Sequence, residues 1–273
     1  MNKIILSAFA DEAGESFDLQ LSALKRNGMQ CIEIRSVENE NVSKITLDKA
    51  KELKMRLDDA GIVCGAIGSP IGKIALDRAA EHRDVLKHVA EIAHILGTDK
   101  VRMFSYHMRP WETEENENKV LDELSVLQEI AQKENLLLCH ENEKGIFGYN
   151  TENCLKILRA VPGMRAVFDP ANFVQCRVNT LYAWNMLKNH VEYLHAKDAK
   201  VDGTVLPCGK GAGFLPIIVE DYLNLGGSMI TLEPHLFSFK ALKTLETDPA
   251  KRSSYENADI AFDTAAKALK SLL

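Results

Sequence analysis

The chain has 273 residues, of which 46% are hydrophobic and 26% charged, a composition typical of a globular protein with one large core or two small ones. Its formal net charge of −6 argues against a nucleic-acid or anionic-membrane surface, because both attract proteins through clustered Lys and Arg. No run approaches the roughly 20 apolar residues that a membrane span requires. We therefore expect a small-molecule partner, with no nucleic acid and no membrane.

The cysteines indicate a reducing compartment. All 6 are scattered without a C-x-x-C pair, and several lie inside apolar, strand-like runs. Reduced thiols in a cytoplasmic protein are the simplest interpretation. The apolar stretch Ile4 to Leu6 is at the lower limit for the core of a signal peptide, so we expect no secretion signal and a cytoplasmic location.

Short β-rich runs alternate with longer amphipathic stretches through the whole chain. Eight strands are expected, at Ile4 to Ala10, Cys31 to Ser36, Ile62 to Ile67, Lys100 to Ser105, Leu136 to Glu141, Arg165 to Asp169, Val191 to His195 and Met229 to Glu233. Eight helices are expected, at Ser16 to Asn27, Leu47 to Ala60, Asp77 to Leu96, Glu114 to Glu134, Thr151 to Ala160, Leu181 to Asn189, Leu215 to Leu225 and Asn257 to Leu272. Each unit is about 34 residues long, which suits one strand, one helix and two loops.

The repeat predicts a single (β/α)8 TIM barrel that covers residues 1–273. Strands separated by helices pair in parallel, and eight such units close into a barrel more readily than they form an open sheet. A doubly wound open sheet is the main alternative, but no Gly-rich turn follows the first expected strand, so the dinucleotide fingerprint is missing. In a barrel, the long loops after the strands meet on one face, where the active sites of this fold lie. These loops are Gly68 to Leu76, Tyr106 to Glu112, Asn142 to Asn150, Ala196 to Gly213 and Pro234 to Ser238.

Four of the expected strands end in a Glu, Asp or His, residue types that commonly bind metal ions. Glu141, Asp169, His195 and Glu233 follow one another at intervals of 28, 26 and 38 residues, about one repeat each. Any one of them could equally be an exposed loop residue. Four in consecutive units would converge at the barrel mouth, where three carboxylates repel one another and lose hydration unless a cation compensates them. With a neutral His, this mostly oxygen set carries a charge of about −3 and suits Mn²⁺, Mg²⁺ or Co²⁺.

The motifs around these four residues resemble those of the xylose isomerase-like TIM barrels, also called the sugar phosphate isomerase/epimerase or AP endonuclease 2 superfamily. The resemblance covers nearly the whole chain and is strongest at His140-Glu141-Asn142-Glu143, Phe168-Asp169-Pro170-Ala171-Asn172-Phe173, His195-Ala196-Lys197-Asp198 and Leu232-Glu233-Pro234-His235. It implies that the four residues bind one divalent metal ion, Mn²⁺ above all, with Mg²⁺, Co²⁺ and Zn²⁺ as alternatives. Related barrels are often dimers or tetramers, so the resemblance is compatible with a homo-oligomer.

The resemblance also implies an enzyme of the isomerase class that epimerises or isomerises a sugar. In it, Glu141 and Glu233 would both bind the metal and act as acid/base catalysts. A ketose or keto-sugar, phosphorylated or not, would bind the ion through its carbonyl and an adjacent hydroxyl oxygen, and the ion would stabilise an enediolate. Glutamates on opposite faces of the reacting carbon would then remove and return a proton. Return to the same carbon inverts the centre, whereas return to the neighbouring carbon interconverts ketose and aldose. The motifs do not choose between these outcomes.

Further polar residues on the loop face are candidate substrate-binding residues: Lys197, Asn172, His235, Glu143, His107 and Arg35. Lys197 could hold a sugar oxygen or form a salt bridge. Asn172 matches a recurrent family position, and we expect it to orient Asp169 by a hydrogen bond. Arg35 has a second interpretation, as an ion pair with Glu33 at the barrel mouth.

Two other features have weaker interpretations. Gly209-Lys210-Gly211-Ala212-Gly213 lacks the spacing of a P-loop, so a flexible hinge is the leading interpretation and a phosphate or carboxylate contact the alternative. His82, His88 and His94 lie six residues apart on one expected helix. This spacing does not bring them onto one face, and we expect them to be exposed.

Three other functions are alternatives to a sugar epimerase or isomerase. A DNA-repair nuclease of the same superfamily would need more histidines and a basic track, but Ser69 and Pro70 stand at the third strand end and the chain is acidic. A metal-dependent lyase or dehydratase of a keto-sugar or keto-inositol stays open, because it begins with the same proton abstraction beside a carbonyl. A non-catalytic sugar-binding barrel is the third alternative, which the intact set of four ligands disfavours.

Overall fold

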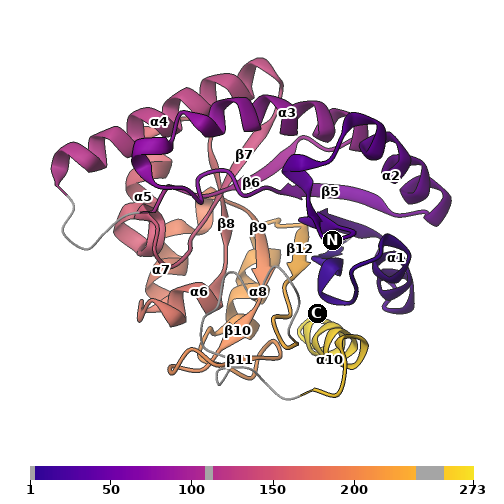
Figure 1. The fold of residues 1–273 in the computed structure, drawn as a ribbon. Helices are drawn as coiled ribbons and strands as arrows, with labels where there is room; N and C mark the ends of the chain where they lie inside the picture. Colours follow the sequence, from indigo (N-terminus) through magenta and orange to yellow (C-terminus); the bar gives the residue numbers. More distant parts are fainter. Residues whose placement is uncertain (1–3, 108–112, 238–254) are drawn as a thin grey trace.

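Eight parallel strands form the centre of the structure, a computed structural model that describes residues 4–107, 113–237 and 255–273. The strands are β1 (Ile5–Ala8), β2 (Cys31–Ile34), β5 (Val63–Gly68), β6 (Lys100–Met103), β7 (Leu137–Glu141), β8 (Arg165–Phe168), β9 (Val191–Ala196) and β12 (Met229–Leu232). They pair in the order β1-β12-β9-β8-β7-β6-β5-β2, and the end strands β1 and β2 are in contact. The sheet therefore curls into a nearly closed TIM barrel (Figure 1), which confirms the predicted fold class.

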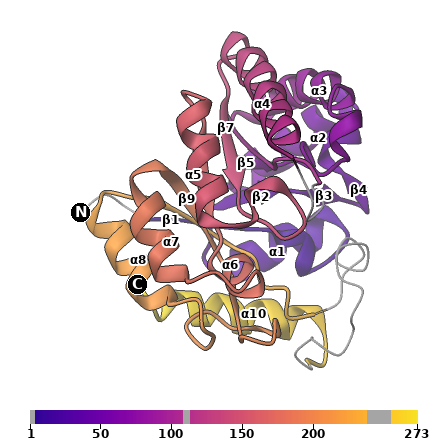
Figure 2. The same ribbon diagram turned by 90° about the vertical axis from the view of Figure 1, so that its left-hand side faces the viewer.

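The helices follow the strands and cover the outside of the barrel. They are α1 (Phe17–Arg26), α2 (Leu47–Ala60), α3 (Glu81–Leu96), α4 (Glu114–Lys133), α5 (Thr151–Ala160), α6 (Pro170–Gln175), α7 (Thr180–Leu187), α8 (Leu215–Asn224) and α10 (Ala258–Lys270). In Figure 1, α2, α3 and α4 lie along the outside of β5, β6 and β7. Figure 2 shows α10 beside α1, where Arg26 forms ion pairs of 2.8 and 3.0 Å with Asp259 and Asp263. Among the described residues, no helix is both long and apolar enough to span a membrane.

Local sequence signals set many of the helix ends. Ser16, Thr46 and Asn150 each accept a hydrogen bond from a backbone N–H in the first turn of α1, α2 and α5, which satisfies a donor that the helix leaves free. Gly61 and Gly97 end α2 and α3 at φ angles of 68° and 79°. This left-handed conformation costs residues with a Cβ about 1–2 kcal/mol, so glycine is favoured where each helix must stop.

The main hydrophobic core lies between the outer face of the sheet and the helices. Its fully buried members include Leu86, Val89, Val101, Leu124 and Leu138. A second, smaller cluster consists of Ala66, Cys139, Val167, Tyr193 and Met229. Cys139 and Tyr193 lie two residues before Glu141 and His195 on β7 and β9, so each pair shares the inner face of the barrel. Burial of each large apolar side chain contributes about 1.5–3 kcal/mol. The barrel is therefore a packed core with polar residues at its mouth.

Several short elements on the loop face were not expected from the sequence. β3 (Ser36–Val37) pairs with β4 (Glu40–Asn41), and β10 (Asp198–Ala199) pairs with β11 (Val205–Leu206), both antiparallel; the short helix α6 is also unexpected. Such elements are too short to show a hydrophobic period. Parts of two expected loops, residues 108–112 and Ser238, lie outside the described residues.

Candidate metal centre

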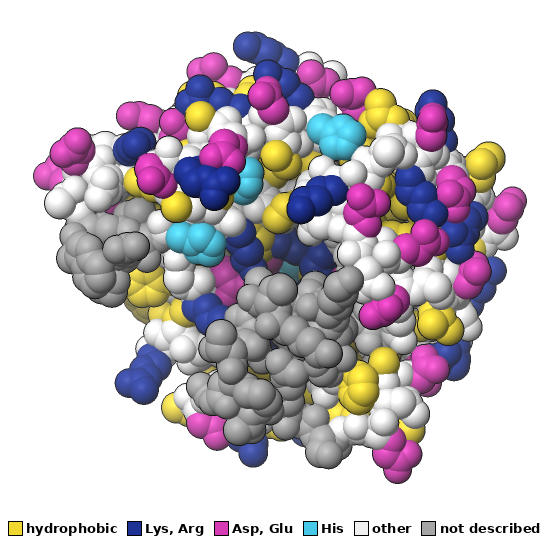
Figure 3. Space-filling model, viewed as in Figure 1, with side chains coloured by type: hydrophobic (Ala, Val, Ile, Leu, Met, Phe, Trp, Pro, Cys, Tyr) yellow, Lys and Arg dark blue, Asp and Glu magenta, His cyan; other side chains and the backbone are white. Residues whose placement is uncertain are grey.

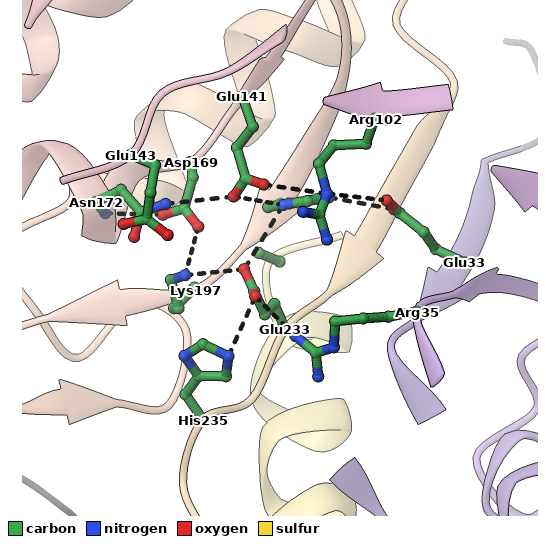
Figure 4. Close-up of polar contacts among 12 residues, drawn as sticks. Glu33, Arg35, Arg102, Glu141, Glu143, Asp169, Asn172, Lys197, Glu233 and His235 are labelled. Atoms are coloured by element: carbon green, nitrogen blue, oxygen red, sulfur yellow. Dashed lines mark hydrogen bonds and ion pairs between the residues drawn. The ribbon is translucent and has the colours of Figure 1, made fainter. Parts of the chain in front are cut away.

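The four predicted ligands meet at the C-terminal mouth of the barrel. Glu141 ends β7, Asp169 and Glu233 directly follow β8 and β12, and His195 precedes the last residue of β9. Each offers one ligand atom, and these atoms all lie within 4.8 Å of one another. The four strands are neighbours in the order β12-β9-β8-β7, so the convergence follows from the repeat. All four side chains are buried, and Figure 4 shows the three carboxylates pointing toward a common centre.

Hydrogen bonds to the backbone hold Asp169 in place. Its Oδ1 accepts the backbone N–H of Asn172 at 2.9 Å, so the carboxylate caps the N-terminus of α6. Pro170 occupies the first turn of that helix, where its missing N–H has no intrahelical partner to lose. Asn142 makes two 2.9 Å bonds with the Asp169 backbone, because its Nδ2 donates to the carbonyl and its Oδ1 accepts the N–H. The ends of β7 and β8 are thereby tied together.

The Asn172 side chain lies beside a different ligand from the one expected. Its Nδ2 donates to Glu141 Oε1 at 3.3 Å and to the Asn142 carbonyl at 2.9 Å. Asp169 is bonded by the backbone N–H of Asn172 rather than by its amide group. The turn into α6 directs the side-chain amide of Asn172 toward β7. Asn172 therefore orients Glu141 through its side chain.

His195 is held between carboxylates on both sides of its ring. Its Nδ1 lies 3.0 Å from Glu141 Oε1 and 3.6 Å from Glu233 Oε2. Its Nε2, on the far side of the ring, lies 3.1 Å from Glu33 Oε2. The Phe9 ring packs edge-on against the imidazole, with 5.1 Å between the ring centroids. These contacts restrict ring rotation, and Nδ1 is the nitrogen that faces the candidate ligands Glu141 and Glu233.

Glu33 and Arg35, considered above as an ion pair, contact different groups of the barrel mouth. Glu33 is buried inside the barrel, where Tyr193 Oη donates to its Oε1 at 3.0 Å. Arg35 lies beyond the end of β2, so strand alternation no longer places it on the same side as Glu33. It binds Asp11 through Nε and Nη2 at 3.0 and 2.9 Å, and its Nη1 donates to Glu233 Oε1 at 3.2 Å. Arg35 therefore contacts one of the candidate ligands directly.

Lys197 is a buried cation among the candidate ligands. Its Nζ lies 2.8 Å from both Asp169 Oδ2 and Glu233 Oε2, and its side chain is only 3% exposed. Figure 4 shows the ammonium group between these two carboxylates. The salt-bridge interpretation of Lys197 therefore agrees with the structure, and contact with a sugar oxygen stays a prediction.

The charged groups of the centre shift one another's protonation. Burial raises the pKa of Glu141, but neighbouring cations, His195 first, outweigh burial and bring it down to about 2. Burial raises the pKa of Asp169 to about 8, although Lys197 opposes this change. For His195, burial lowers the pKa, yet the carboxylates of Glu141 and Glu33 raise it to about 10. In this buried site, the pKa of each group thus depends on burial and on the charges of its neighbours.

The donor set fits a divalent metal ion. Three carboxylates and one imidazole provide hard oxygen and borderline nitrogen ligands, a combination that Mn²⁺, Mg²⁺, Co²⁺ and Zn²⁺ can accept. The spacings of 3.0 and 3.6 Å from His195 Nδ1 to the Glu141 and Glu233 oxygens suit atoms that share one ion at bond lengths of about 2.1 Å. A charge of +2 also compensates three buried carboxylates better than single protons do.

A cavity of about 410 Å³ adjoins the centre, a volume within the range of small-ligand sites. Its lining consists of Arg35, Ser36, Asn39, Asn41, Gly68, Ser69, Pro70, Lys73, Arg102, Phe104, Glu141, Glu143, Glu233 and His235. Figure 3 shows a hollow near the middle of this face with Lys or Arg side chains inside it. The size and polarity of the cavity suit a small polar molecule.

Three of the predicted substrate-binding residues, Arg35, Glu143 and His235, line the cavity, whereas Lys197, Asn172 and His107 are not among its lining residues. Glu143 accepts a hydrogen bond from Lys73 Nζ at 3.0 Å. His235 Nε2 lies 3.1 Å from Glu233 Oε1, as Figure 4 shows. His107 is exposed and lies outside the cavity lining. Its backbone forms bridges with residues 75 and 146, and its contact with substrate stays a prediction.

Sequence reasoning missed Arg102 on β6. Its Nε lies 3.3 Å from Glu141 Oε2, and its Nη1 donates to the Ser69 carbonyl at 3.2 Å. The guanidinium also lies over the Phe104 ring, 4.5 Å from the centroid. An arginine between the apolar Val101 and Met103 of an expected strand was a usable signal, because a buried charge requires a partner.

The Gly209 to Gly213 loop does bind an anion, but that anion is the carboxylate of Asp198. The backbone N–H groups of Gly209, Gly211 and Gly213 donate to it at 3.0, 2.9 and 2.9 Å. A Cβ at Gly211 would lie 2.2 Å from Asp198 Oδ1, so glycine allows the loop to close on the side chain. Because these N–H groups are already bonded, the structure supports neither the hinge nor the substrate-anion interpretation.

Two of the three helix histidines are less exposed than expected. His82 Nδ1 accepts the Gly72 N–H at 2.8 Å, and His88 Nε2 lies 2.9 Å from the Ile45 carbonyl. Both are half-buried, whereas His94 is exposed. These rings bond neighbouring loops and lie outside the metal centre.

Comparison with known proteins identifies the family. The family model described as "Xylose isomerase-like TIM barrel" matches residues 21–222. The chain therefore belongs to the xylose isomerase-like TIM barrel family. No curated protein matches it.

Solved structures with this fold include proteins with different printed descriptions. The chain is similar to the probable 3-DHS dehydratase AsbF from Bacillus anthracis, with 15% identity, a TM-score of 0.76 and 98% of each chain covered. It is similar to the IolI protein with a bound zinc atom, with 17% identity, a TM-score of 0.76 and 98% of each chain covered. It is also similar to an L-ribulose 3-epimerase, with 17% identity and a TM-score of 0.75, over 100% of this chain and 95% of that one. At these identities the likeness shows a shared fold.

Proposed function

We propose that this chain is a divalent-metal-dependent epimerase or isomerase of a ketose or keto-sugar, free or phosphorylated. The observation that carries the proposal is that Glu141 and Glu233 both line a cavity of about 410 Å³. They belong to the first and last of the four ligand-bearing strands, so they flank the centre from opposite sides. Two carboxylates placed in this way suit removal of a proton from one face of a carbon and its return to the other.

The proposed ion is Mn²⁺, with Mg²⁺, Co²⁺ and Zn²⁺ as alternatives, and Glu141, Asp169, His195 and Glu233 would hold it. The mostly oxygen donor set favours the harder ions of this series. When bound, the ion supplies a Lewis acid that polarises a carbonyl and stabilises the negative charge of an enediolate. The similar IolI structure contains a zinc atom, which is compatible with a divalent ion in this fold.

The contacts of Glu233 support its role in proton transfer. Burial raises the pKa of Glu233, but Lys197 and His235 outweigh burial and lower it well below its usual range. The carboxylate is therefore ionised at neutral pH, as a base must be. A substrate oxygen that took over the Lys197 ammonium would relieve Glu233 of this cation and make it a stronger base.

Five side chains of the centre are the proposed substrate contacts: Lys197, Asn172, His235, Glu143 and Arg35. Lys197 and Arg35 offer N–H donors next to Glu233, and Glu143 offers a carboxylate acceptor across the cavity. Sugar hydroxyl groups donate and accept hydrogen bonds, so a mixed lining of this kind suits them.

A dehydratase or lyase acting on a keto-sugar or keto-inositol is the second candidate. The observation that favours it is the Lys197 ammonium, which lies 2.8 Å from Glu233 Oε2. Proton abstraction by Glu233 followed by proton donation from Lys197 to a departing hydroxyl would complete an elimination. Both candidates share the first step, so the product distinguishes them.

The test is a screen of free and phosphorylated ketoses and 3-keto-sugars in D₂O with the MnCl₂-loaded protein, followed by NMR. We expect exchange of a C–H next to the carbonyl of at least one compound, with an epimer or an aldose as product. A dehydrated product would favour the second candidate. Metal and sugar binding without exchange would favour a non-catalytic barrel, and a protein that binds no metal and exchanges no proton would contradict the proposal.

A further inference from the structure

Glu33 is a buried carboxylate that belongs neither to the ligand set nor to the proposed acid/base pair. It lies on β2, and its side chain is 0% exposed. Around the barrel, β1 and β12 separate β2 from β9, so Glu33 meets His195 across the barrel interior. Figure 4 shows Glu33 and Asp169 on opposite sides of the centre.

Both oxygens of Glu33 have partners that fix the direction of the carboxylate. Oε1 accepts from Tyr193 Oη at 3.0 Å, and Oε2 lies 3.1 Å from His195 Nε2. Arg102 Nε lies 3.9 Å from Oε1, which places a positive charge near this carboxylate. Tyr193 and His195 are two residues apart on β9, so the same strand supplies both contacts.

The chemistry of the contact determines which imidazole nitrogen is free. An ionised carboxylate only accepts hydrogen bonds, so the nitrogen that bonds Glu33 must carry a proton. In an imidazole with one proton, that proton is then on Nε2, and Nδ1 keeps its lone pair. Nδ1 is the atom that faces Glu141 and Glu233, at 3.0 and 3.6 Å.

We propose that Glu33 is a positioning residue of the metal centre: it accepts the Nε2–H of His195 and thereby presents Nδ1 to the divalent ion. Carboxylate partners of this kind fix the orientation of a ligating His and raise its basicity, and their loss lowers metal affinity about 10- to 100-fold. The inference rests on the proposed function only in that the centre binds a divalent ion. It holds for an epimerase, an isomerase or a dehydratase alike.

A purely structural role for Glu33 makes a different prediction. If Glu33 only balanced the charge of Arg102 or filled space, its replacement by the isosteric Gln would change stability without changing the protonated nitrogen of His195. The decisive readouts are therefore metal affinity and the His195 tautomer, rather than melting temperature alone.

The first experiment measures MnCl₂ affinity by titration calorimetry for the wild type, Glu33→Gln and a matched control, Glu192→Gln. Glu192 is on β9, the strand that carries His195, but its carboxylate pairs with Lys100 and Arg165 at 3.5 and 3.6 Å and does not contact His195. Glu33→Gln should bind Mn²⁺ about 10- to 100-fold more weakly, and Glu192→Gln should stay within about twofold of the wild type. Equal affinity of Glu33→Gln and wild type would overturn the inference.

The second experiment observes the His195 ring nitrogens by ¹⁵N NMR in the ZnCl₂-loaded protein. We expect a protonated Nε2 and a metal-bound Nδ1; a metal-bound Nε2 would overturn the inference.

A second variant, Tyr193→Phe, tests the same contact if Glu33→Gln does not fold. It keeps the Glu33 carboxylate but removes the hydrogen bond at Oε1, so it should weaken Mn²⁺ binding several-fold. A wild type without metal affinity would contradict the proposed function, whereas wild-type binding that Glu33→Gln and Tyr193→Phe both match would contradict this inference alone.

Discussion

Lys197 Nζ and Asp169 Oδ2 lie 2.8 Å apart inside the barrel mouth. A positively charged side chain of the protein itself therefore lies among the candidate metal ligands. The same ammonium is 2.8 Å from Glu233 Oε2. It reduces the repulsion between the carboxylates that follow β8 and β12, the two neighbours of β9. A divalent ion in the centre would take over part of this role.

Replacement of Lys197 by Met should therefore destabilise the metal-free protein. The variant keeps an apolar stem of similar length but leaves Asp169 and Glu233 without their shared partner, and breaking a buried pair costs about 3–5 kcal/mol. Thermal unfolding in EDTA should show a lower Tm than for the wild type. Addition of MnCl₂ should raise the Tm of Lys197→Met more than that of the wild type, and an unchanged Tm in EDTA would show that the ion pairs contribute little.

Glu233→Gln should abolish turnover while the fold stays intact. The substitution removes the ionised carboxylate but keeps the shape of the side chain, and loss of a general base lowers the rate by about 10²–10⁴-fold. Turnover of the substrate found by the deuterium screen measures the effect, and circular dichroism checks the fold. Glu220→Gln on the exposed face of α8 is the control with the same chemical change. Full activity of Glu233→Gln would refute the mechanism with two glutamates.

Asp198→Asn should loosen the loop that encloses it. Asp198 accepts hydrogen bonds from the backbone N–H groups of Ala199, Gly209, Gly211 and Gly213. In the Asn variant, the side-chain NH₂ group would replace one of the two acceptor oxygens and face backbone N–H groups that also donate. We expect a loss of about 2–3 kcal/mol in the free energy of unfolding and faster amide hydrogen exchange at the three glycines. Asp99→Asn, an exposed carboxylate, should leave both measurements unchanged. Unaltered exchange in Asp198→Asn would mean that the loop is held by other contacts.

Gly72→Ala should cost far more stability than Gly61→Ala. Both glycines have positive φ angles, 84° and 68°, but a Cβ at Gly72 would lie 2.0 Å from the Phe104 carbonyl oxygen, whereas nothing lies within 4 Å at Gly61. The left-handed conformation alone costs about 1–2 kcal/mol, and overpacking adds about 1–3 kcal/mol. Urea unfolding of the two variants measures the difference, which isolates the steric part. Equal losses would show that the backbone near Phe104 yields easily.

His82 should make stability fall in mild acid. Burial lowers the pKa of His82, and its Nδ1 accepts the Gly72 N–H, a bond that needs the unprotonated nitrogen. Because the folded-state pKa is below the unfolded value of about 6.5, the unfolded chain binds more protons, and this contribution is complete above that pH and is lost as the pH falls further. Urea unfolding at pH 8 and 5.5 should show a smaller acid loss for His82→Gln than for the wild type. The same loss in both proteins would exclude His82 as a cause.

Much of the fold could be predicted because each βα unit carries local signals. The bounds of α2 and α5 agree with the sequence prediction at both ends, since capping residues and apolar periodicity mark them. The convergence of Glu141 and Asp169 also follows from spacing, because parallel neighbouring strands end on the same side. The short helix α6 and the hairpin of β10 and β11 carry no such period, so they were not predicted.

The sequence by itself determined the order of strands and helices, and with it which four side chains meet at the barrel mouth. Only the tertiary structure decided their partners: Glu33 bonds His195 instead of Arg35, and the glycine loop encloses Asp198. The physical reason is that strand periodicity specifies which face a side chain is on, whereas hydrogen bonds of about 3 Å depend on residues far apart in the chain that closure of the barrel brings together.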